Sequence, residues 1–408
     1  MTTLTVGASA PSTRSASRTR KLRPVLRVLL LVWAASSAGV LGSAETLAQN
    51  AYITNSGDNT VSVINTSTNK VIATIPVDNG PNALTVTPDG GNVYVANGGS
   101  ASVSVIDPET NGVIDTISVG SGPGGGVAAA PDGSKVYVLN GCFDLCGVVS
   151  VIATATDTVI ATIPVGDRPS GAAVSPDGRK VYVTNGFANS VSVIATKTNT
   201  VSDTIAVGMF PQFLAVTPDG GRVYVGNSNS NTVSVIETAH DTVIATIPVG
   251  STDPNAGGSY PQGVAVSPDG SKVYVANSFL ANSVSVISTA TNTVIATIPV
   301  GSGPEGLAVT ADGSKVYVAN VWDYDISVIN TATNKVEMTV PVGINPTTFG
   351  IFIQRPLGFA GTPGKSNCYG QSVSALTSQY HGMNAAAEAL GYSSAKALQT
   401  TILAYCEA

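Results

Sequence analysis

The sequence repeats one unit seven times, and this periodicity limits the folds open to the chain more than any other feature. A tyrosine with an asparagine three positions later, as in "YVAN", recurs at steps of 42, 43, 45, 42, 50 and 43 residues. The tyrosines are Tyr52, Tyr94, Tyr137, Tyr182, Tyr224, Tyr274 and Tyr317, and the asparagines are Asn55, Asn97, Asn140, Asn185, Asn227, Asn277 and Asn320. A repeat of this length is typical of one supersecondary unit that packs on its neighbours.

Each copy predicts four short β-strands. In the sixth copy the β-rich runs are "GVAVS", "KVYVAN", "SVSVIS" and "VIATIPV". Residues 267–270 between the first two runs, Ser-Pro-Asp-Gly, fit a type I turn, and Thr291 with Asn292 supplies a second tight turn between the last two. Seven four-stranded antiparallel units indicate an all-β protein, a seven-bladed β-propeller.

The two ends of the repeat predict how the ring closes. The first copy starts at "AYITN" and lacks an innermost strand, whereas "NPTTFGIFIQ" after Val342 supplies an innermost strand with nothing following it. We therefore expect the C-terminal strand to complete the N-terminal blade. Such closure removes two open sheet edges that would otherwise promote aggregation.

The repeated phrases identify a family. "PDGxxVYVxN", "VSVI" and "VIATIPVG" resemble the repeats of YVTN β-propellers, which occur in exported YncE-like bacterial proteins and in archaeal surface-layer proteins. The resemblance covers roughly residues 50–354. It implies a location in the cell envelope or at the cell surface, and binding rather than catalysis. Some relatives bind single-stranded DNA.

Residues 1–44 are predicted to be an export signal. Basic residues without an acid precede an uncharged run over residues 28–42, and small residues follow, with cleavage expected after Ala44 or Ala48. An uncleaved anchor is the alternative, but the run is shorter than the roughly 20 residues that a bilayer span needs. After cleavage we expect no transmembrane span and a periplasmic, cell-surface or extracellular protein.

Removal of the signal makes the chain strongly acidic. Residues 1–44 contain six basic and no acidic residues, so Lys+Arg falls from 19 to 13 while Asp+Glu stays at 25, a net charge of −12. This balance opposes binding to nucleic acid, whose phosphates require Lys and Arg. It leaves a cationic ligand or Ca²⁺ open. An envelope protein or a glycan is the expected partner of a monomeric propeller.

Four cysteines predict two disulfides in an exported chain, Cys142 with Cys146 and Cys368 with Cys406. Residues 355–367 read as a linker rich in Pro and Gly. Residues 368–408 are expected to form a small helical tail, which is too short for a core of its own and is tied by its two cysteines. This tail resembles Cys-bracketed tails of other exported bacterial proteins.

Propeller geometry sorts the loops onto two faces. The Pro-Asp-Gly and Thr-x-Thr-Asn turns share one face, which we call the turn face. The loops that follow Asn55 and its equivalents, and the loops that begin each innermost strand, share the other, which we call the variable face. The turns repeat with little change and are expected to be structural, so any binding site should lie on the variable face.

Two sets of side chains are candidates for that site. Aromatic residues suggest a partner or glycan surface, although several could instead pack inward over loop backbones; they are Phe187, Phe210, Phe213, Tyr260, Phe279, Trp322 and Tyr324. Polar residues after the loop prolines could ring the mouth of the channel or form a solvated rim. They are Asn82, Ser170, Gln212, Gln262, Glu305 and Thr347, with Gly124 in the seventh place.

Signals for catalysis are weak. Glu305, Asp323 and Asp325 are candidate Ca²⁺ ligands, and no other cofactor is expected. The glycine-rich stretch over residues 120–126 lacks the lysine and helix of a phosphate loop, and His240 and His381 assemble no Ser-His-Asp set. The sequence favours an exported, non-catalytic binding or structural module of the cell envelope. The alternative is a metal-dependent hydrolase or lyase, similar to propeller lactonases, with its site at the channel mouth.

Overall fold

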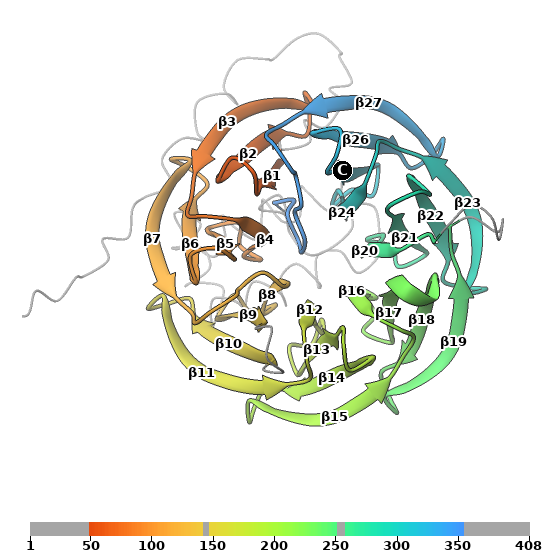
Figure 1. Ribbon diagram of the computed structural model, residues 1–408, viewed down its shortest axis with the longest axis horizontal. Helices are drawn as coiled ribbons and strands as arrows, with labels where there is room; N and C mark the ends of the chain where they lie inside the picture. Colours follow the sequence, from red (N-terminus) through yellow and green to blue (C-terminus); the bar gives the residue numbers. More distant parts are fainter. Residues whose placement is uncertain (1–48, 142–146, 251–257, 355–408) are drawn as a thin grey trace, which may run out of the picture. The chain divides into compact units, whose positions relative to one another are not determined.

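Seven antiparallel sheets follow one another along the chain and surround a common axis in the computed structural model, which describes residues 49–141, 147–250 and 258–354 (Figure 1). The predicted seven-bladed β-propeller is therefore confirmed. The export signal, the four cysteines and the C-terminal tail lie outside the described residues and stay predictions. In the described ranges the one helical element is a 3₁₀ turn, η1 (Ser228–Ser230), and no helix is long and apolar enough to cross a membrane.

The strands of each blade are consecutive and run from the axis to the rim (Figure 1). Blade 1 contains β1 (Asn50–Asn55), β2 (Thr60–Asn65) and β3 (Lys70–Pro76). Blade 2 contains β4 (Pro81–Val86), β5 (Val93–Asn97), β6 (Ser102–Asp107) and β7 (Gly112–Ser118). Blade 3 contains β8 (Val127–Ala129), β9 (Lys135–Gly141), β10 (Gly147–Ala153) and β11 (Thr158–Val165).

The remaining blades repeat this order. Blade 4 contains β12 (Pro169–Val174), β13 (Lys180–Asn185), β14 (Ser190–Ala195) and β15 (Thr200–Ala206). Blade 5 contains β16 (Pro211–Val216), β17 (Arg222–Asn227), β18 (Thr232–Glu237) and β19 (Thr242–Pro248). Blade 6 contains β20 (Pro261–Val266), β21 (Lys272–Asn277), β22 (Ser283–Ser288) and β23 (Thr293–Pro299). Blade 7 contains β24 (Pro304–Val309), β25 (Lys315–Asn320), β26 (Asp325–Asn330) and β27 (Lys335–Pro341).

Burial along the strands follows their place in the blade. In β21 the side chains of Val273, Tyr274 and Val275 are all buried because neighbouring blades cover both faces of the sheet. In β23, at the rim, only Ile298 is buried, because only one face of this strand meets another blade. The core is therefore a set of apolar layers between blades, and it holds the ring together.

Residues 346–354, the closing segment, complete blade 1 as the ends of the repeat predict. The N–H of Tyr52 donates to the carbonyl oxygen of Phe352 at 2.8 Å, and the N–H of Gln354 donates to that of Asn50 at 2.8 Å. The pairing with β1 consists of separate bridges rather than one continuous strand, because the chain turns at Gly350, whose φ is 109°.

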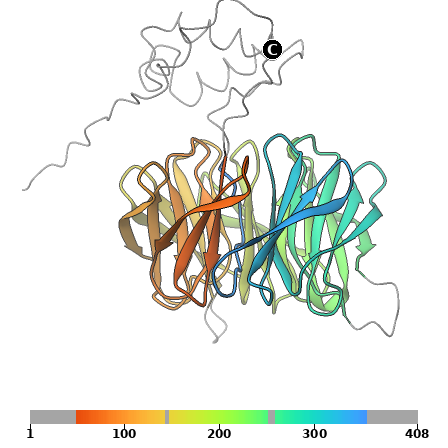
Figure 2. The same cartoon turned by 90° about the horizontal axis from the view of Figure 1, so that it is seen from above.

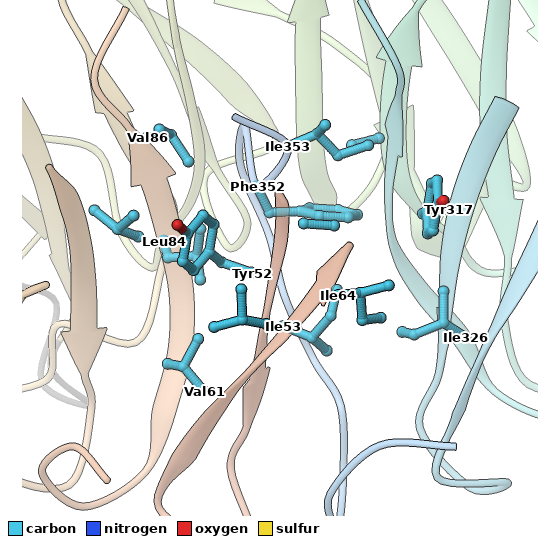
Figure 3. Packing of buried hydrophobic residues seen from close by; sticks show 14 of the residues in the cluster. Tyr52, Ile53, Val61, Ile64, Leu84, Val86, Tyr317, Ile326, Phe352 and Ile353 are labelled. Atoms are coloured by element: carbon cyan, nitrogen blue, oxygen red, sulfur yellow. The ribbon is translucent and has the colours of Figure 1, made fainter. Parts of the chain in front are cut away.

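The closing segment also ties blade 1 to its neighbours. The N–H of Leu84 in β4 donates to the carbonyl oxygen of Phe349 at 3.0 Å. Phe352 and Ile353 are buried in a cluster that includes Leu84 from blade 2 and Tyr317 from blade 7 (Figure 3). Both ends of the ring are thus held by one segment.

The turn face is held by hydrogen bonds within and between blades. In the sixth copy, the N–H of Gly270 donates to the carbonyl oxygen of Ser267 at 2.8 Å, and the Ser267 hydroxyl donates to the Asp269 carboxylate at 2.5 Å. That hydroxyl bond lowers the pKa of Asp269. The Tyr224 hydroxyl donates to Oδ1 of Asn292 in the next blade at 2.8 Å. The recurring tyrosines and turns are therefore structural.

Candidate functional site

The variable face is made by two sets of loops at one end of the blades, which Figure 2 shows edge-on. One set joins the second and third strands of a blade, and the other joins an outermost strand to the next innermost strand. An asparagine in the first set often fixes the second: the N–H of Gly80 donates to Oδ1 of Asn59 at 2.9 Å, and that of Gly303 donates to Oδ1 of Asn282 at 3.0 Å. The loop backbones are therefore held in place while their side chains vary.

The residue before each loop proline has a positive φ. Glycine adopts this conformation at no steric cost, whereas another residue pays about 1–2 kcal/mol. The loops into blades 4, 5 and 6 nevertheless place large side chains here. The seven residues are Gly80 (62°), Gly122 (69°), Arg168 (52°), Phe210 (55°), Tyr260 (41°), Gly303 (65°) and Asn345 (54°).

Two more aromatic residues share this property. Phe279 has a φ of 61° and Tyr324 a φ of 57°, both in loops between second and third strands. Tyr324 occupies the place that Asn59 and Asn189 hold in other blades. Blades 4 to 7 thus keep large side chains where the backbone favours glycine or asparagine, and such strain is common at functional sites.

Three of these side chains form the Arg168 cluster. The Phe187 and Phe210 rings are tilted, with centroids 5.7 Å apart. The Arg168 guanidinium carbon lies 5.0 Å from the first centroid and 4.9 Å from the second, so both rings orient the cation. Arg168 was not among the residues predicted from the sequence. The signal that could have identified it is the residue before each loop proline, which is Gly or Asn in four copies and a large residue in the other three.

Three other aromatic residues form a row that we call the aromatic ladder. The Tyr260 and Phe279 ring centroids lie 5.3 Å apart, and those of Phe279 and Trp322 lie 5.9 Å apart, edge to face. Phe279 and Trp322 are about half exposed, at 50% and 52%, and Tyr260 is also exposed. The exposed aromatic residues thus divide into two clusters from neighbouring blades, and their role as a partner or glycan surface stays a prediction. Tyr324 is exposed beside the ladder in blade 7.

Phe213 is not an exposed aromatic residue, contrary to the sequence-based expectation. Its ring stacks on Phe349 of the closing segment with centroids 3.8 Å apart, and both are buried. The position of Phe213 is Gly171 in blade 4 and Gly263 in blade 6. Phe213 therefore belongs to the packing of the axial region.

The polar residues after the loop prolines share one structural place. Each lies at the start of an innermost strand, where the pairing register shifts in a β-bulge in most blades, as between Pro261 and Val264 or between Pro304 and Leu307. Ser170 and Thr347 are buried there; Asn82, Gln212, Gln262 and Glu305 are half-buried. β-Bulges at such rims redirect side chains and are frequent next to binding sites.

Glu305 is the one acid in this set. Burial raises the pKa of its carboxyl group from 4.5 to about 7, and no charged group contributes to the shift. Near neutral pH the side chain therefore exists in both protonation states. A half-buried carboxyl group with such a pKa can take part in proton transfer or in binding of a charged ligand.

The candidate Ca²⁺ ligands are not brought together. One carboxylate oxygen of Asp323 accepts the N–H of Ser302 at 2.6 Å, and Asp325 accepts the side-chain amide of Asn320 at 2.7 Å. In the part of the chain that the structure describes, no group of three His, Cys, Asp or Glu side chains lies close enough to hold a metal. Asp323 and Asp325 support the loop instead.

Comparisons with known proteins agree with this architecture. A family described as YNCE-like beta-propeller matches residues 28–124 and 256–354, and one described as lactonase, 7-bladed beta-propeller, matches residues 140–246. The predicted resemblance to YncE-like propellers is confirmed. None of the curated proteins compared with the chain matches it.

Similar solved structures are numerous, so likeness of fold says little about activity. Hydrazine synthase from Kuenenia stuttgartiensis has a TM-score of 0.61 and 25% identity, over 72% of this chain and 99% of that one. A protein of unknown function from Desulfotomaculum acetoxidans has a TM-score of 0.64 and 20% identity, over 75% and 99%. A provisionally assigned 6-phosphogluconolactonase from Bacteroides uniformis has a TM-score of 0.61 and 19% identity, over 74% and 98%.

Proposed function

The chain is consistent with a YncE-like propeller family, and from that premise we propose that it is an exported, non-catalytic binding module of the cell envelope that acts through its variable face. Its partner is an envelope protein or a glycan. The export signal expected over residues 1–44 and the acidic remainder of the chain support the location.

One observation carries the proposal: large side chains stand at positive φ in consecutive blades. Arg168, Phe210 and Tyr260 occupy the position where Gly80, Gly122 and Gly303 lie. Each costs about 1–2 kcal/mol relative to glycine, so folding alone does not explain them. Aromatic and arginine side chains dominate the energy of binding interfaces.

The turn face supports the assignment by contrast. Its recurring polar groups bond to one another within the propeller, as in the bond from the Tyr224 hydroxyl to Asn292 and the ion pair of Lys180 with Asp241 at 2.7 Å. His240 is exposed on this face and contacts Glu237 at 2.8 Å. Groups that are already bonded to their neighbours gain little from a partner.

The test is affinity capture from an envelope extract with the full chain and a matched variant. The variant carries Arg168→Gly, Phe210→Gly and Tyr260→Gly. Glycine already occupies this position in the loops into blades 2, 3 and 7, so the variant should be at least as stable as the wild-type chain. We expect the wild-type chain to retain a protein or glycan that the variant does not. Equal capture by both chains at equal melting temperature would contradict the proposal.

A metal-dependent hydrolase remains the second candidate, because the lactonase family matches residues 140–246. Its site would lie at the channel mouth around Glu305. Hydrolysis of lactone substrates with and without added Ca²⁺, compared with Glu305→Gln, tests it directly. Turnover that requires both the metal and Glu305 would replace the binding function with this one.

A further inference from the structure

The basic residues are shared unequally between the two faces. Within residues 49–141, 147–250 and 258–354 there are ten Lys and Arg residues, and nine lie in or beside the turns of the turn face: Lys70, Lys135, Arg179, Lys180, Lys197, Arg222, Lys272, Lys315 and Lys335. The variable face holds one base, Arg168, and six acids: Asp58, Asp78, Asp167, Glu305, Asp323 and Asp325. One base against six acids gives this part of the variable face a net charge of −5.

Most of this negative charge gathers where the ring closes. Glu305, Asp323 and Asp325 belong to blade 7, and Asp58 and Asp78 to the loops of blade 1, which adjoins it (Figure 1). Arg168, the one base among the described residues of the variable face, lies in the loop into blade 4. A concentration of one sign of charge attracts ligands of the opposite sign.

The aromatic ladder meets this acidic region at blade 7. The Trp322 ring lies against Gly303, where an added Cβ would be 2.9 Å from the ring. Gly303 is two residues before Glu305, and Trp322 directly precedes Asp323. At the other end of the ladder, Tyr260 is two residues before Gln262, the neighbour of Glu305 on the adjacent innermost strand.

Gln262 and Glu305 are held next to each other by the backbone. A Cβ at Gly263 would collide with the carbonyl oxygen of Glu305, so the two innermost strands are in direct contact. None of the described residues forms a hydrogen bond or ion pair with the Glu305 carboxylate, which leaves it available to a ligand. An ionised carboxylate in such a place is costly unless an opposite charge reaches it.

We propose that Glu305 and the aromatic ladder of Tyr260, Phe279 and Trp322 bind an organic cation, an ammonium group on an apolar frame. The inference rests on the proposed binding function and names its ligand class. Aromatic faces attract cations, tryptophan most strongly, and the Glu305 carboxylate supplies the counter-charge. A bare metal ion fits less well, because Ca²⁺ takes six to eight oxygen ligands and no three acids meet in the described chain.

The probe is choline, with 3,3-dimethylbutan-1-ol as its uncharged isostere, titrated into the full chain at low ionic strength and followed by NMR. We expect choline to bind about tenfold more tightly than the isostere. Glu305→Gln and Trp322→Ala should each weaken choline binding by about tenfold. Met209→Ala is the matched control, because it removes an exposed apolar side chain from another loop of the same face, and it should leave choline binding unchanged.

The pH dependence gives a second readout. Because the carboxyl group of Glu305 has a pKa of about 7, choline should bind more tightly as the pH rises through 7. Gln262 and Thr347 on the adjoining strands do not titrate. Asp323 and Asp325 are the other acids on the variable face of this blade, whereas Asp312 lies in a turn of the turn face and Glu337 in β27. Burial and the charge of Asp323 raise the pKa of Asp325. Glu305→Gln should abolish the change around pH 7 if Glu305 is the counter-charge.

The outcomes separate this inference from the function on which it rests. Equal affinity for choline and its isostere, or choline binding that survives Glu305→Gln and Trp322→Ala, overturns the cation site. Tighter binding of Ca²⁺ than of choline at equal ionic strength also overturns the cation site. If envelope capture still depends on Arg168, Phe210 and Tyr260 in that case, the binding function stands without a cationic ligand. Loss of that dependence would refute the function itself.

Discussion

The turn face and the variable face are built from the same seven repeats, yet they use the left-handed conformation in opposite ways. On the turn face, Asn or Asp fills the left-handed position of the last turn in every blade, as at Asn69 and Asn292. On the variable face, blades 4 to 7 put Arg, Phe and Tyr at positive φ instead. The first choice minimises strain, and the second accepts strain to present a side chain.

The difference shows which of the recurring residues stabilise the propeller. Several of the recurring tyrosines donate to a turn residue of a neighbouring blade, as Tyr224 and Tyr317 do, so the turn residues change little between copies. The backbone of the opposite loops is held by a few local hydrogen bonds, such as those from Gly303 to Asn282 and from Ser302 to Asp323. The side chains beyond those bonds are free to change, and that freedom is where a binding site can arise.

Both faces depend on closure of the propeller, so a variant that disrupts closure should lose the most stability. Phe352→Ala should cost about 3–5 kcal/mol of unfolding free energy, because the Phe352 side chain is fully buried among residues of three blades. Ile351→Ala is the matched control: its side chain is 50% exposed, so the cost should stay within about 0.5 kcal/mol. Equal losses in urea denaturation would contradict closure by this segment.

The turn face should respond next most strongly. Asn292→Ala removes a residue suited to its φ of 52° and leaves the buried Tyr224 hydroxyl without its acceptor. We expect a loss of about 2 kcal/mol, measured by chemical denaturation. A cost below about 0.5 kcal/mol would mean that the bonds between blades on this face are not structural.

The faces should also differ in the sign of their pH dependence. On the turn face the pKa of Asp269 is lowered, so its stabilising effect is present above its unfolded pKa of about 3.9 and is lost as the pH falls through the folded pKa. The pKa of Glu305 is raised to about 7, so its contribution is complete below about 4.5 and is lost as the pH rises through 7.

Melting curves of two variants check these signs. Asp269→Asn should be less stable than the wild-type chain at pH 6, and the difference should shrink as the pH falls below about 4. Glu305→Gln should be nearly equal at pH 4 and more stable at pH 8. The same sign for both variants across this range would remove the electrostatic contrast between the faces.

The smallest expected effect has the opposite sign. Tyr324→Gly relieves a φ of 57° in an exposed side chain, so the protein should gain up to about 1 kcal/mol of stability. Gly303→Ala is the reciprocal variant and should destabilise, because φ is 65° and the new Cβ would crowd Trp322. A destabilised Tyr324→Gly would show that Tyr324 is kept for packing rather than for binding.

Much of the fold could be predicted from the sequence because the pattern of one blade recurs seven times. The turn chemistry around Pro268 and Gly270 and the missing innermost strand before Tyr52 were enough for the blades and their closure. The inward stack of Phe213 could not be predicted, because its partner Phe349 is distant in the chain and takes part only once the ring closes. The ladder was predicted as a set of aromatic residues, whereas its order depends on contacts between loops of different blades.

The most direct test of the account compares one variant of each face against the partner that envelope capture retains. Trp322→Ala with Phe279→Ala changes the variable face, and Lys135→Ala with Lys272→Ala changes residues beside the Pro-Asp-Gly turns. We expect the aromatic variant to lose about 2 kcal/mol or more of binding free energy with little change in melting temperature, and the lysine variant to bind like the wild-type chain. If the lysine variant lost binding and the aromatic variant kept it, recognition would belong to the turn face and the account would be wrong.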